Sequence, residues 1–339
     1  MTILVTGGLG YIGSHTVVEL LNNNFEVVII DDLSNTEKFI LKNIEEITGK
    51  KPIFYPFDLK RKELLKQVFD AHKIEGCIHF AAYKAVGESQ VKPIDYYENN
   101  LFSLINLLQE MKERNISNFI FSSSCTVYGQ ADTMPIDENT PLKLPESSYG
   151  KTKQMGEEIL KDFATAHQKK VTLLRYFNPI GAHPSAKLGE LPIGIPNNLV
   201  PYVMQTAAGV REKLSVWGND YPTEDGTAIR DYIYVVDLAK AHVKALQKLI
   251  SENSETLVDI YNLGTGKGSS VLEVVHAFEK ANDVAVPYQI CERRAGDITI
   301  AYANADKAEK ELGWKSETSL EEALRTVWQW QKYLETREK

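Results

Sequence analysis

The stretch ILVTGGLGYIGSH, residues 3–15, decides the fold class of this 339-residue chain. A short apolar run leads directly into Gly7, Gly10 and Gly13, and an apolar pattern typical of a helix follows. Glycines at this spacing allow a tight turn, close approach of the backbone to a pyrophosphate and close packing of helix on strand. The N-terminus of the helix then faces the negative phosphates. The stretch therefore predicts a strand–loop–helix unit that binds a dinucleotide.

Further along the chain, apolar runs alternate with helical segments. The runs are FEVVIID, PIFYPFDL, GCIHFAA, NFIFSSS and VTLLRYF. They are continuous rather than alternating, which is typical of parallel strands buried on both faces. Between them, Tyr96–Lys112 carries apolar residues at helical spacing. We expect an α/β fold with an N-terminal doubly wound parallel sheet of the Rossmann type.

After Phe177 the regular alternation of apolar runs and helical segments ends. The segment NPIGAHPSAKLGELPIGIPNN is rich in proline and glycine and reads as a loop. Mixed short elements follow, with a final helix around Ser319–Leu334. We expect an NAD-binding domain over residues 1–177 and a smaller mixed α/β substrate domain over 178–339, with segments such as 228–245 packing back on the first domain.

The composition disfavours nucleic acids, membranes and metal ions as binding partners. The net charge of −8 and the lack of a Lys/Arg stripe disfavour nucleic acid. Apolar runs such as Phe25–Ile30 are too short to span a membrane, and the N-terminus has no basic region typical of a signal peptide. The three cysteines lack metal-binding spacing, so we expect no metal site and a cytoplasmic location.

Acidic residues end the second and third strands. Asp31, roughly 20 residues beyond the glycine loop, can accept hydrogen bonds from ribose hydroxyls and would repel a 2′-phosphate. No arginine follows at once, so the pattern favours NAD over NADP. The same DDLSN segment is also typical of a turn. Asp58 could reach an adenine amine or equally cap the next helix.

Two further motifs combine hydroxyls with a cation. Ser122, Ser123 and Ser124 end the fifth strand, where ligands of open parallel sheets bind. Tyr149 and Lys153 are four residues apart, so they fall on one face of a helix. Taken alone, the serines could cap a turn and the Tyr–Lys pair could be surface decoration.

Together these motifs resemble the extended short-chain dehydrogenase/reductase family, and the resemblance runs nearly end to end. Within that family the chain is similar to the 4-epimerases of UDP-hexoses. The similarity lies in the segments VTGGLGYIGSHT, KAVGESQ, SSSCTVYG, SYGKTK, LRYFNPIGAHPS, GIPNNLVPYV, GTAIRDYIYVVDLA, YNLGTGKGSSV and RRAGDI. The resemblance implies interconversion of UDP-glucose and UDP-galactose through a 4-keto sugar, with NAD holding the hydride between the two half-reactions.

The resemblance also implies roles for individual residues. Tyr149 would be the general base, Lys153 its helper and Ser124 the third member. A free tyrosine has a pKa of about 10, so work near neutrality needs a drop of about three units. A neighbouring cation lowers a phenol pKa, and we expect Lys153 and the positive nicotinamide ring to supply this effect together.

Two sets of binding residues follow from the same match. The expected NAD site comprises Gly7, Gly10, Tyr11, Ile12, Gly13, Asp31, Asn35, Asp58, Leu59, Phe80, Lys84, Asn99, Ser124, Tyr149, Lys153 and Phe177. The expected UDP-sugar site comprises Lys84, Ser124, Tyr149, Asn178, Asn198, Leu199, Trp217, Arg230, Arg294, Asp297 and Ala301. For Arg230 the alternative is a local ion pair with Asp231.

Ala301 occupies the family's gate position beside the 2-position of the sugar. A small residue there predicts activity on UDP-N-acetylglucosamine and UDP-N-acetylgalactosamine as well, unless Ala301 is simply a packing residue or Tyr302 swings inward. The family also forms homodimers through a four-helix bundle. The matching segments lie near Tyr96–Lys112 and Tyr149–Ala166, although their apolar faces could equally be buried within one chain.

Three other functions compete. Sugar-nucleotide 4,6-dehydratases place Asp-Glu directly after the serine or threonine, where this chain has Cys125 and Thr126. Decarboxylases and 4-epimerases of glucuronyl nucleotides need a site for the C5 carboxylate, which the sequence does not reveal. A non-enzymatic NAD-binding regulator could dispense with Tyr149, Lys153 and Ser124, yet all three are present.

Overall fold

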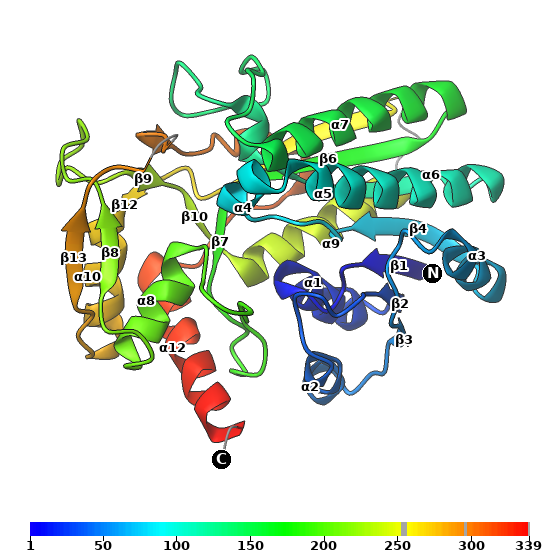
Figure 1. Ribbon diagram of the computed structural model, residues 1–339. Helices are drawn as coiled ribbons and strands as arrows, with labels where there is room; N and C mark the ends of the chain where they lie inside the picture. The colour runs from blue at the N-terminus through cyan, green and yellow to red at the C-terminus, as the bar shows by residue number, and fades with distance from the viewer. Residues whose placement is uncertain (252–255, 295–296, 338–339) are drawn as a thin grey trace.

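A seven-stranded sheet forms the larger part of the molecule (Figure 1). The computed structural model describes residues 1–251, 256–294 and 297–337. The strand order is β11-β6-β5-β4-β1-β2-β3, and every neighbouring pair is parallel. The bounds are β1 Thr2–Thr6, β2 Glu26–Ile30, β3 Ile53–Tyr55, β4 Ile74–His79, β5 Asn118–Ser124, β6 Lys170–Tyr176 and β11 Val258–Leu263. The six predicted strands and their parallel arrangement are confirmed.

Helices cover both faces of this sheet. One face carries α1 (Tyr11–Asn22), α2 (Phe39–Thr48) and α9 (Val235–Ser251); the other carries α3 (Lys62–Ala71), α6 (Ser103–Glu113) and α7 (Ser148–His167). Successive residues of β1 point to opposite faces, so Ile3 and Val5 join one apolar core and Leu4 joins the other. Burial on both faces explains the continuous apolar runs and confirms the doubly wound class.

The predicted helix over Tyr96–Lys112 consists of three joined pieces. Helix α5 spans Pro93–Tyr97, a π-helical turn spans Glu98–Phe102, and α6 continues to Glu113. Proline at the start of α5 suits a position whose N–H would have no partner within the helix. π-helical turns occur frequently at functional sites. This one buries Asn99 and Asn100 beside the end of the sheet.

The second part of the molecule is smaller and mixed. Its helices α8 (Leu199–Ala207), α10 (Val271–Asn282) and α12 (Leu320–Arg337) pack together, and α12 confirms the predicted final helix. Short strands form the pairs β7 (Asn178–Ile180) with β10 (Tyr232–Tyr234) and β8 (Leu214–Trp217) with β13 (Tyr288–Cys291). Strand β9 (Ile229–Arg230) joins β12 (Ser269–Ser270) and β14 (Ile300–Ala301). The remaining helices are α4 (Val86–Val91) and α11 (Asp306–Leu312).

The chain crosses between the two parts more than once. Strand β11 adds residues 258–263 to the edge of the large sheet, beside β6. Helix α9 packs against α1, β5 and β6. We predicted an NAD-binding domain up to residue 177 and a UDP-sugar-binding domain after it. This assignment of the two ligands stays a prediction. In the described ranges, no helix combines the length and the apolar character needed to cross a membrane.

Candidate active site

The glycine loop joins β1 to α1 at the carboxyl edge of the sheet. Gly7 has φ +67, a conformation that favours glycine, and its nitrogen donates to Ile30 O at 2.8 Å. A Cβ atom on Gly13 would lie 2.1 Å from Gly7 O, so only glycine permits this close approach of helix to loop. Gly10 is the N-cap residue of α1. It has no side chain that could accept a hydrogen bond from the first N–H groups of the helix. These features fit a bound pyrophosphate.

Asp31 supports the glycine loop directly. Its side chain is buried, with Oδ2 accepting from Leu9 N and Oδ1 from Leu33 N, each at 3.0 Å. Burial raises the pKa of this carboxyl above its usual value, while the two backbone hydrogen bonds oppose the change. Each oxygen keeps a second lone pair that a ribose hydroxyl can use. Asp58 accepts from Lys60 N at 2.8 Å in the turn after β3, and it does not cap α3, whose N-cap residue is Arg61. Its contact with the adenine stays a prediction.

The serine, tyrosine and lysine meet at the end of β5. Ser124 is the last residue of β5, and Tyr149 and Lys153 occupy successive turns at the start of α7. Ser147 caps this helix by accepting from Gly150 N at 3.1 Å. Lys153 Nζ lies 5.9 Å from the centroid of the Tyr149 ring and donates to Ser122 O at 2.6 Å. The structure thus brings the three predicted residues together.

Burial controls the protonation of this group. It raises the pKa of Tyr149 to about 12, an effect that a hydrogen bond with Ser124 partly offsets. It lowers the pKa of Lys153 to about 7. The lowered phenol pKa that we expected is therefore not produced by the protein's own groups. The reason is that burial disfavours both the phenolate and the ammonium.

The other predicted cofactor residues line the same edge of the sheet or support it. Tyr11 donates through its hydroxyl to Gly181 O at 2.6 Å, and Phe80 N donates to Thr6 O at 3.0 Å. Asn99 Nδ2 donates to Asn100 Oδ1 at 3.1 Å. Leu59 and Phe177 are buried, Ile12 packs against the core, and Asn35 is exposed.

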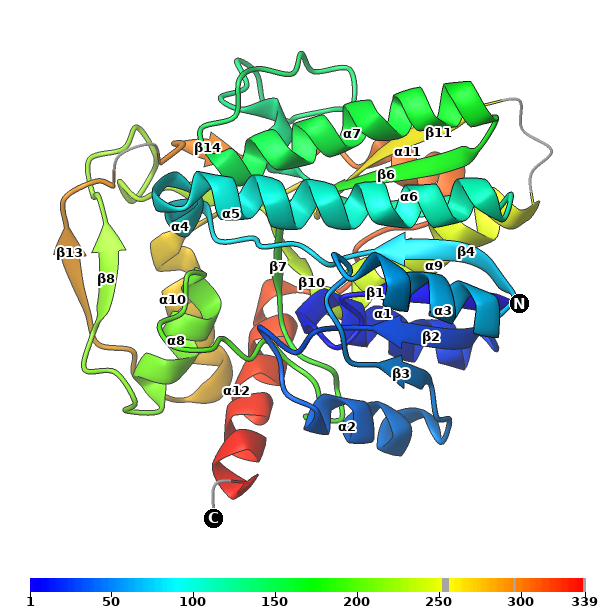
Figure 2. The ribbon, with the colours of Figure 1, turned by 45° about the vertical axis from the view of Figure 1, so that its right-hand side comes forward.

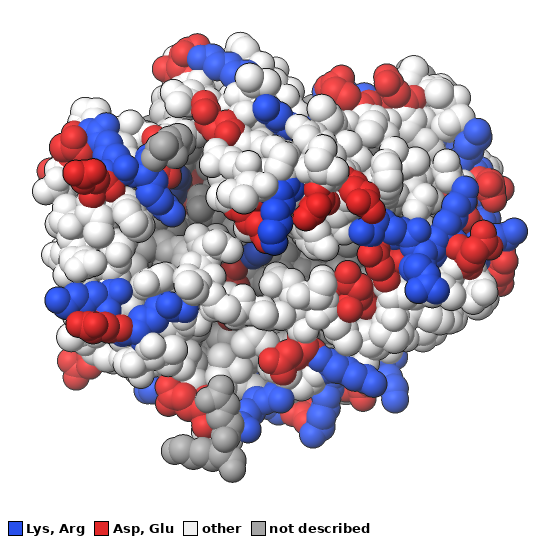
Figure 3. All heavy atoms as spheres, viewed as in Figure 1, with Lys and Arg blue, Asp and Glu red and all other residues white. Residues whose placement is uncertain are grey.

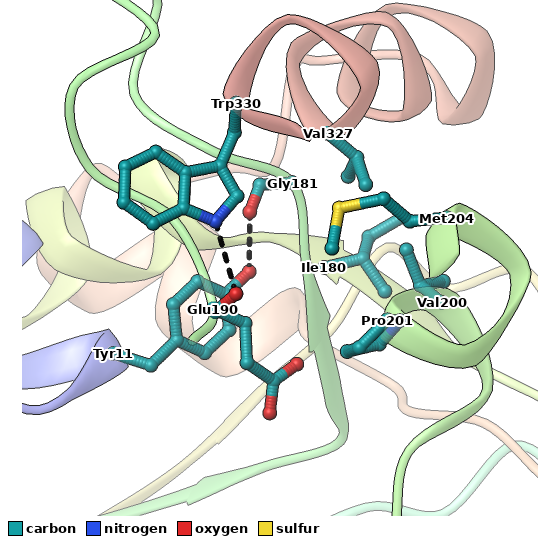
Figure 4. A pocket seen from close by; sticks show the side chains of 9 residues that line it. All are labelled: Tyr11, Ile180, Gly181, Glu190, Val200, Pro201, Met204, Val327 and Trp330. Atoms are coloured by element: carbon teal, nitrogen blue, oxygen red, sulfur yellow. Dashed lines mark hydrogen bonds between the residues drawn. The ribbon is translucent and has the colours of Figure 1, made fainter. Parts of the chain in front are cut away.

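Glu190 is a residue that the sequence reasoning missed. Its Oε1 accepts from Lys84 Nζ at 2.9 Å and from Asn198 Nδ2 at 2.7 Å, so one oxygen joins two predicted ligand residues from the two parts of the molecule. Its backbone oxygen accepts from Trp330 Nε1 at 3.0 Å (Figure 4). In Figure 4, Tyr11 and Glu190 border a small cavity beside α8 and α12. The available signal was that Glu190 is the one acidic residue between 178 and 198.

The predicted UDP-sugar residues come from several elements of the second part. Asn178 begins β7 and donates its N–H to Asp231 O at 2.9 Å, while Asn198 and Leu199 begin α8. Arg294 lies over Trp217, with 5.6 Å from Cζ to the ring centroid, and its Nε approaches Asp297 Oδ2 at 3.3 Å. Residues 295 and 296 of the RRAGDI segment lie outside the described residues.

Arg230 is not paired with Asp231. The Asp231 carboxylate is fully buried and accepts from Thr265 N at 2.9 Å, Ala303 N at 3.1 Å and Gly266 N at 3.3 Å. Arg230 Nη1 donates to the carbonyl of Ile229 at 2.8 Å. Over residues 1–251, 256–294 and 297–337, no ion pair joins Arg230 to an acidic side chain.

Ala301 packs in a small apolar cluster. It is 9% exposed and lies with Val127 and Phe177, both beside the predicted site. The next residue, Tyr302, turns the other way, because successive side chains in extended backbone point to opposite sides. A Cβ atom on Gly268 would lie 3.5 Å from the Tyr302 ring, which places that ring against the 268 loop. Tyr302 therefore does not fill the space beside Ala301.

The surface view supports a site between the two parts. Figure 3 shows a hollow near the centre of the face seen in Figure 1, with acidic and basic side chains interspersed around it. Tyr149 and Lys153 stand at the same carboxyl edge of the sheet as the glycine loop. A Tyr–Lys pair so placed on a Rossmann sheet, with a second lobe following, defines the extended short-chain dehydrogenase/reductases.

Comparison with known proteins narrows this class. The family model described as GDP-mannose 4,6 dehydratase matches residues 4–327. A UDP-glucose 4-epimerase of Bacillus subtilis is 54% identical, over 98% of this chain and 97% of the relative. The UDP-glucose 4-epimerase of Bifidobacterium longum, solved in complex with NAD+ and UDP, superposes with a TM-score of 0.94 at 48% identity, covering 98% of each chain. That of Stenotrophomonas maltophila, solved with NAD and formylated UDP-arabinopyranose, gives 0.96 at 44% identity, covering 99% of each.

The chain belongs to the UDP-glucose 4-epimerases of the extended short-chain dehydrogenase/reductase family.

Proposed function

We propose that this protein interconverts UDP-glucose and UDP-galactose with NAD as a resident cofactor. The observation that carries the proposal is the meeting of Tyr149, Lys153 and Ser124 at the end of β5, beside the glycine loop. Relatives with this activity match nearly the whole chain, which supports the proposal.

The chain's own residues fit a dinucleotide. The glycine loop would hold the pyrophosphate at the N-terminus of α1, and the Asp31 carboxylate would bind the adenosine ribose. A 2′-phosphate would meet the negative charge of Asp31, so NAD is preferred over NADP. Tyr11, Ile12, Asn35, Asp58, Leu59, Phe80, Lys84, Asn99 and Phe177 would complete the site.

The proton chemistry belongs to Tyr149. Its phenolate removes the proton of the C4 hydroxyl as the C4 hydrogen leaves with its electron pair, and its phenol returns a proton when the C4–H bond forms again. Bound NAD supplies the acceptor and donor of that hydride and, in its oxidised form, a positive charge. Lys153 holds an ammonium one helical turn from Tyr149, and Ser124 hydrogen-bonds the phenol. Tyr149 gives back in the second half-reaction the proton that it took in the first, so inversion of C4 would leave the protein unchanged and would involve no net redox change.

The UDP-sugar side draws on the second part of the molecule. Arg230 and Arg294 carry planar forks that suit the oxygens of a diphosphate. Asn178, Asn198, Leu199, Trp217 and Asp297 would complete the nucleotide site. We assign cofactor binding mainly to residues 1–177 and substrate binding mainly to 178–339.

Dehydration is disfavoured at this site. Elimination needs a carboxylic acid and a base next to the sugar, whereas Cys125 and Thr126 follow Ser124. Burial raises the pKa of the Cys125 thiol to about 12, so it is a poor proton donor at neutral pH. The sugar is therefore epimerised rather than dehydrated.

We extend the proposed substrates to UDP-N-acetylglucosamine and UDP-N-acetylgalactosamine. Ala301 is small, and the neighbouring tyrosine lies against the 268 loop. A small side chain at this position would leave more room for an acetamido group than a tyrosine would.

The proposed assembly is a cytoplasmic homodimer. Helices α5, α6 and α7 lie side by side on one flank (Figure 2). Large apolar side chains are exposed along this flank: Val91 is 81% exposed, Ile94 72% and Phe102 55%. A second copy of the same flank would cover them, as the four-helix bundle predicts. The three cysteines are free thiols, which suits a reducing compartment.

One experiment tests the central proposal. The purified protein is given UDP-galactose without added NAD, and the products are separated and quantified. We expect UDP-glucose to form to equilibrium, with NAD released when the protein is denatured. Absence of UDP-glucose from folded, NAD-loaded protein would contradict the proposal.

A further inference from the structure

Glu157 continues the face of α7 that carries Tyr149 and Lys153. The three residues follow one another at intervals of four, one helical turn apart. The Glu157 side chain is 0% exposed, which is rare for a carboxylate unless it is paired. Its Oε1 accepts from Arg175 Nε at 2.9 Å and its Oε2 from Arg175 Nη2 at 2.5 Å. This geometry is the bidentate pair that fixes both side chains.

The Glu157–Arg175 pair ties several elements of the large sheet together. Ser123 Oγ donates to Glu157 Oε1 at 2.5 Å, and Arg175 Nη1 donates to the Tyr128 hydroxyl at 3.0 Å. Tyr128 in turn donates to Asn262 Oδ1 at 2.7 Å. The network therefore links α7 to β5, β6 and β11, and every member is buried.

This network holds α7 where the reaction needs it. Lys153 Nζ donates to Ser122 O, and Glu157 accepts from the side chain of Ser123. Helix α7 is thus attached at two successive residues of β5, directly before Ser124. Two attachment points on one strand define the rotation of the helix about its axis. That rotation decides whether the Tyr149 phenol faces the Ser124 hydroxyl.

Glu157 also supplies charge next to Lys153. Titratable or charged residues surround the Tyr149–Lys153 pair and its neighbour Glu157 from five elements. They are Glu157 on α7, His79 on β4, Tyr96 on α5, Cys125 after β5, and Tyr176 and Arg175 on β6, with Arg175 positively charged and paired to Glu157. Burial lowers the pKa of His79 to about 3 and raises the pKa of the tyrosines and the cysteine, so these four are neutral near pH 7. Burial lowers the pKa of Lys153, and Glu157 opposes that change.

We propose that Glu157 is a positioning residue of the epimerase reaction. Through Arg175 and Ser123 it fixes α7 over the end of β5, and through its charge it keeps Lys153 protonated beside Tyr149. The inference rests on the proposed function, because it assigns Tyr149 the role of base. Removal of the carboxylate makes the ammonium less stable. The Tyr149 phenolate then loses a cation, and the phenol gives up its proton only at higher pH.

The test uses the NAD-loaded protein and the variant Glu157→Gln, which keeps the shape and removes the charge. The Tyr149 titration is read as the ultraviolet difference in tyrosinate absorbance between each protein and its own Tyr149→Phe version. In Glu157→Gln we expect the midpoint of the Tyr149 titration to rise by about one pH unit. The rising limb of the plot of kcat against pH should move up by the same amount. A shift of that size is about a tenfold loss of kcat on the rising limb. KM for UDP-galactose stays within about twofold, an order-of-magnitude expectation for a residue that does not touch the substrate.

Glu110 provides the matched control. It is 1% exposed, lies on α6 and forms an ion pair with Arg114 one turn later. Glu110→Gln makes the same chemical change at another buried carboxylate, and Arg114 keeps Asp70 and Glu113 as partners, so this variant should leave the Tyr149 midpoint in place. A Glu157→Gln variant that loses activity with no shift of the midpoint would overturn the proposal. An equal shift in Glu110→Gln would overturn it as well.

A second variant covers the case in which Glu157→Gln fails to fold, since that change leaves Arg175 buried without its partner. Glu157→Gln with Arg175→Met removes both charges, so no buried charge is left without its partner. We expect this double variant to fold and to show an upward shift. An unshifted midpoint in the folded double variant contradicts the charge role. The titration needs no sugar nucleotide, so its failure is distinguishable from a failure of the epimerase assay on the parent.

Discussion

The phenol of Tyr149 and the amine of Lys153 share one buried place, and burial acts on both in the same sense. It favours the neutral phenol and the neutral amine, with pKa values of about 12 and about 7. Each group has an ordinary pKa of about 10 when it is exposed to water. The general base therefore depends on positive charge brought to it, and on Lys153 remaining protonated.

Tyr149→Phe tests the base directly. The ring stays and the proton acceptor is lost, so we expect turnover of UDP-galactose to fall roughly 100- to 10,000-fold. NAD should remain bound, because the glycine loop is untouched. Steady-state rates and the NAD content of denatured protein measure the two effects. Tyr288→Phe, at an exposed residue of β13, is the control and should behave like the parent. If the turnover rate of Tyr149→Phe is within a few-fold of the parent's, Tyr149 is not the general base.

Ala301→Tyr tests the breadth of substrate. The added ring enters the space beside the sugar's 2-position, so we expect kcat/KM for UDP-N-acetylgalactosamine to fall at least about tenfold relative to UDP-galactose, the scale of one lost steric fit. The ratio is taken on one protein, so any general loss of stability cancels. If the parent itself cannot use the acetylated sugars, another group closes that end of the pocket.

For individual residues, the sequence predicts contacts between near neighbours in the chain, but it does not predict contacts between distant ones. Tyr149 and Lys153 are four residues apart, so helical geometry alone brings them together. Glu190 is 106 residues from its partner Lys84, and Arg175 is 18 from Glu157 on a different kind of element. Only the fold reveals such pairs. The role of Asp58 cannot be decided from the sequence, because one aspartate after a strand suits both a helix cap and a ligand. In the structure it makes a turn contact with Lys60 N and does not cap α3.

At the scale of elements, the glycine loop makes the sharpest prediction. Gly13→Ala places a methyl group 2.1 Å from Gly7 O, so the start of α1 must move away from the loop. We expect bound NAD to fall to roughly a tenth of the parent level or less, since a misplaced helix end loses its contacts to the phosphates. NAD released from denatured protein measures this. Gly87→Ala in α4 is the matched control, because a methyl group there meets open space. Equal NAD content in the two variants would contradict the role of the loop.

The strands differed in how readily the sequence revealed them. The six predicted strands are continuous apolar runs because helices cover them on both faces. Strand β11 is harder to predict, because its sequence VDIYNL carries the polar residues Asp259 and Asn262 and is not a continuous apolar run. The π-helical turn at Glu98–Phe102 also escaped notice, since the apolar spacing on either side of it still reads as one helix. Polar residues within a strand and local unwinding of a helix therefore hide both elements from a search for apolar runs.

At the scale of the whole molecule, the apolar flank of α5, α6 and α7 predicts a dimer that one charge should break. Phe102→Glu puts a carboxylate in the middle of the flank, where a second copy would bury it. We expect a dimer for the parent and a monomer for the variant by light scattering. Val210→Glu, at a 65% exposed residue near α8, is the control and should stay dimeric. A monomeric parent would show that the flank has another purpose.

The place of β11 at the edge of the sheet has a consequence for synthesis. Six residues of β6 pair with β11, and Asn262 provides the acceptor for the buried Tyr128 hydroxyl. A nascent chain that has emerged only as far as residue 177 has made β6 but not its neighbour. Its apolar edge is then open to pairing with other chains. Domains commonly fold from the N-terminus during translation. Here the sheet must wait about 86 further residues, at roughly 5–20 residues per second, before it can close. For several seconds each new copy exposes this unpaired edge to its neighbours.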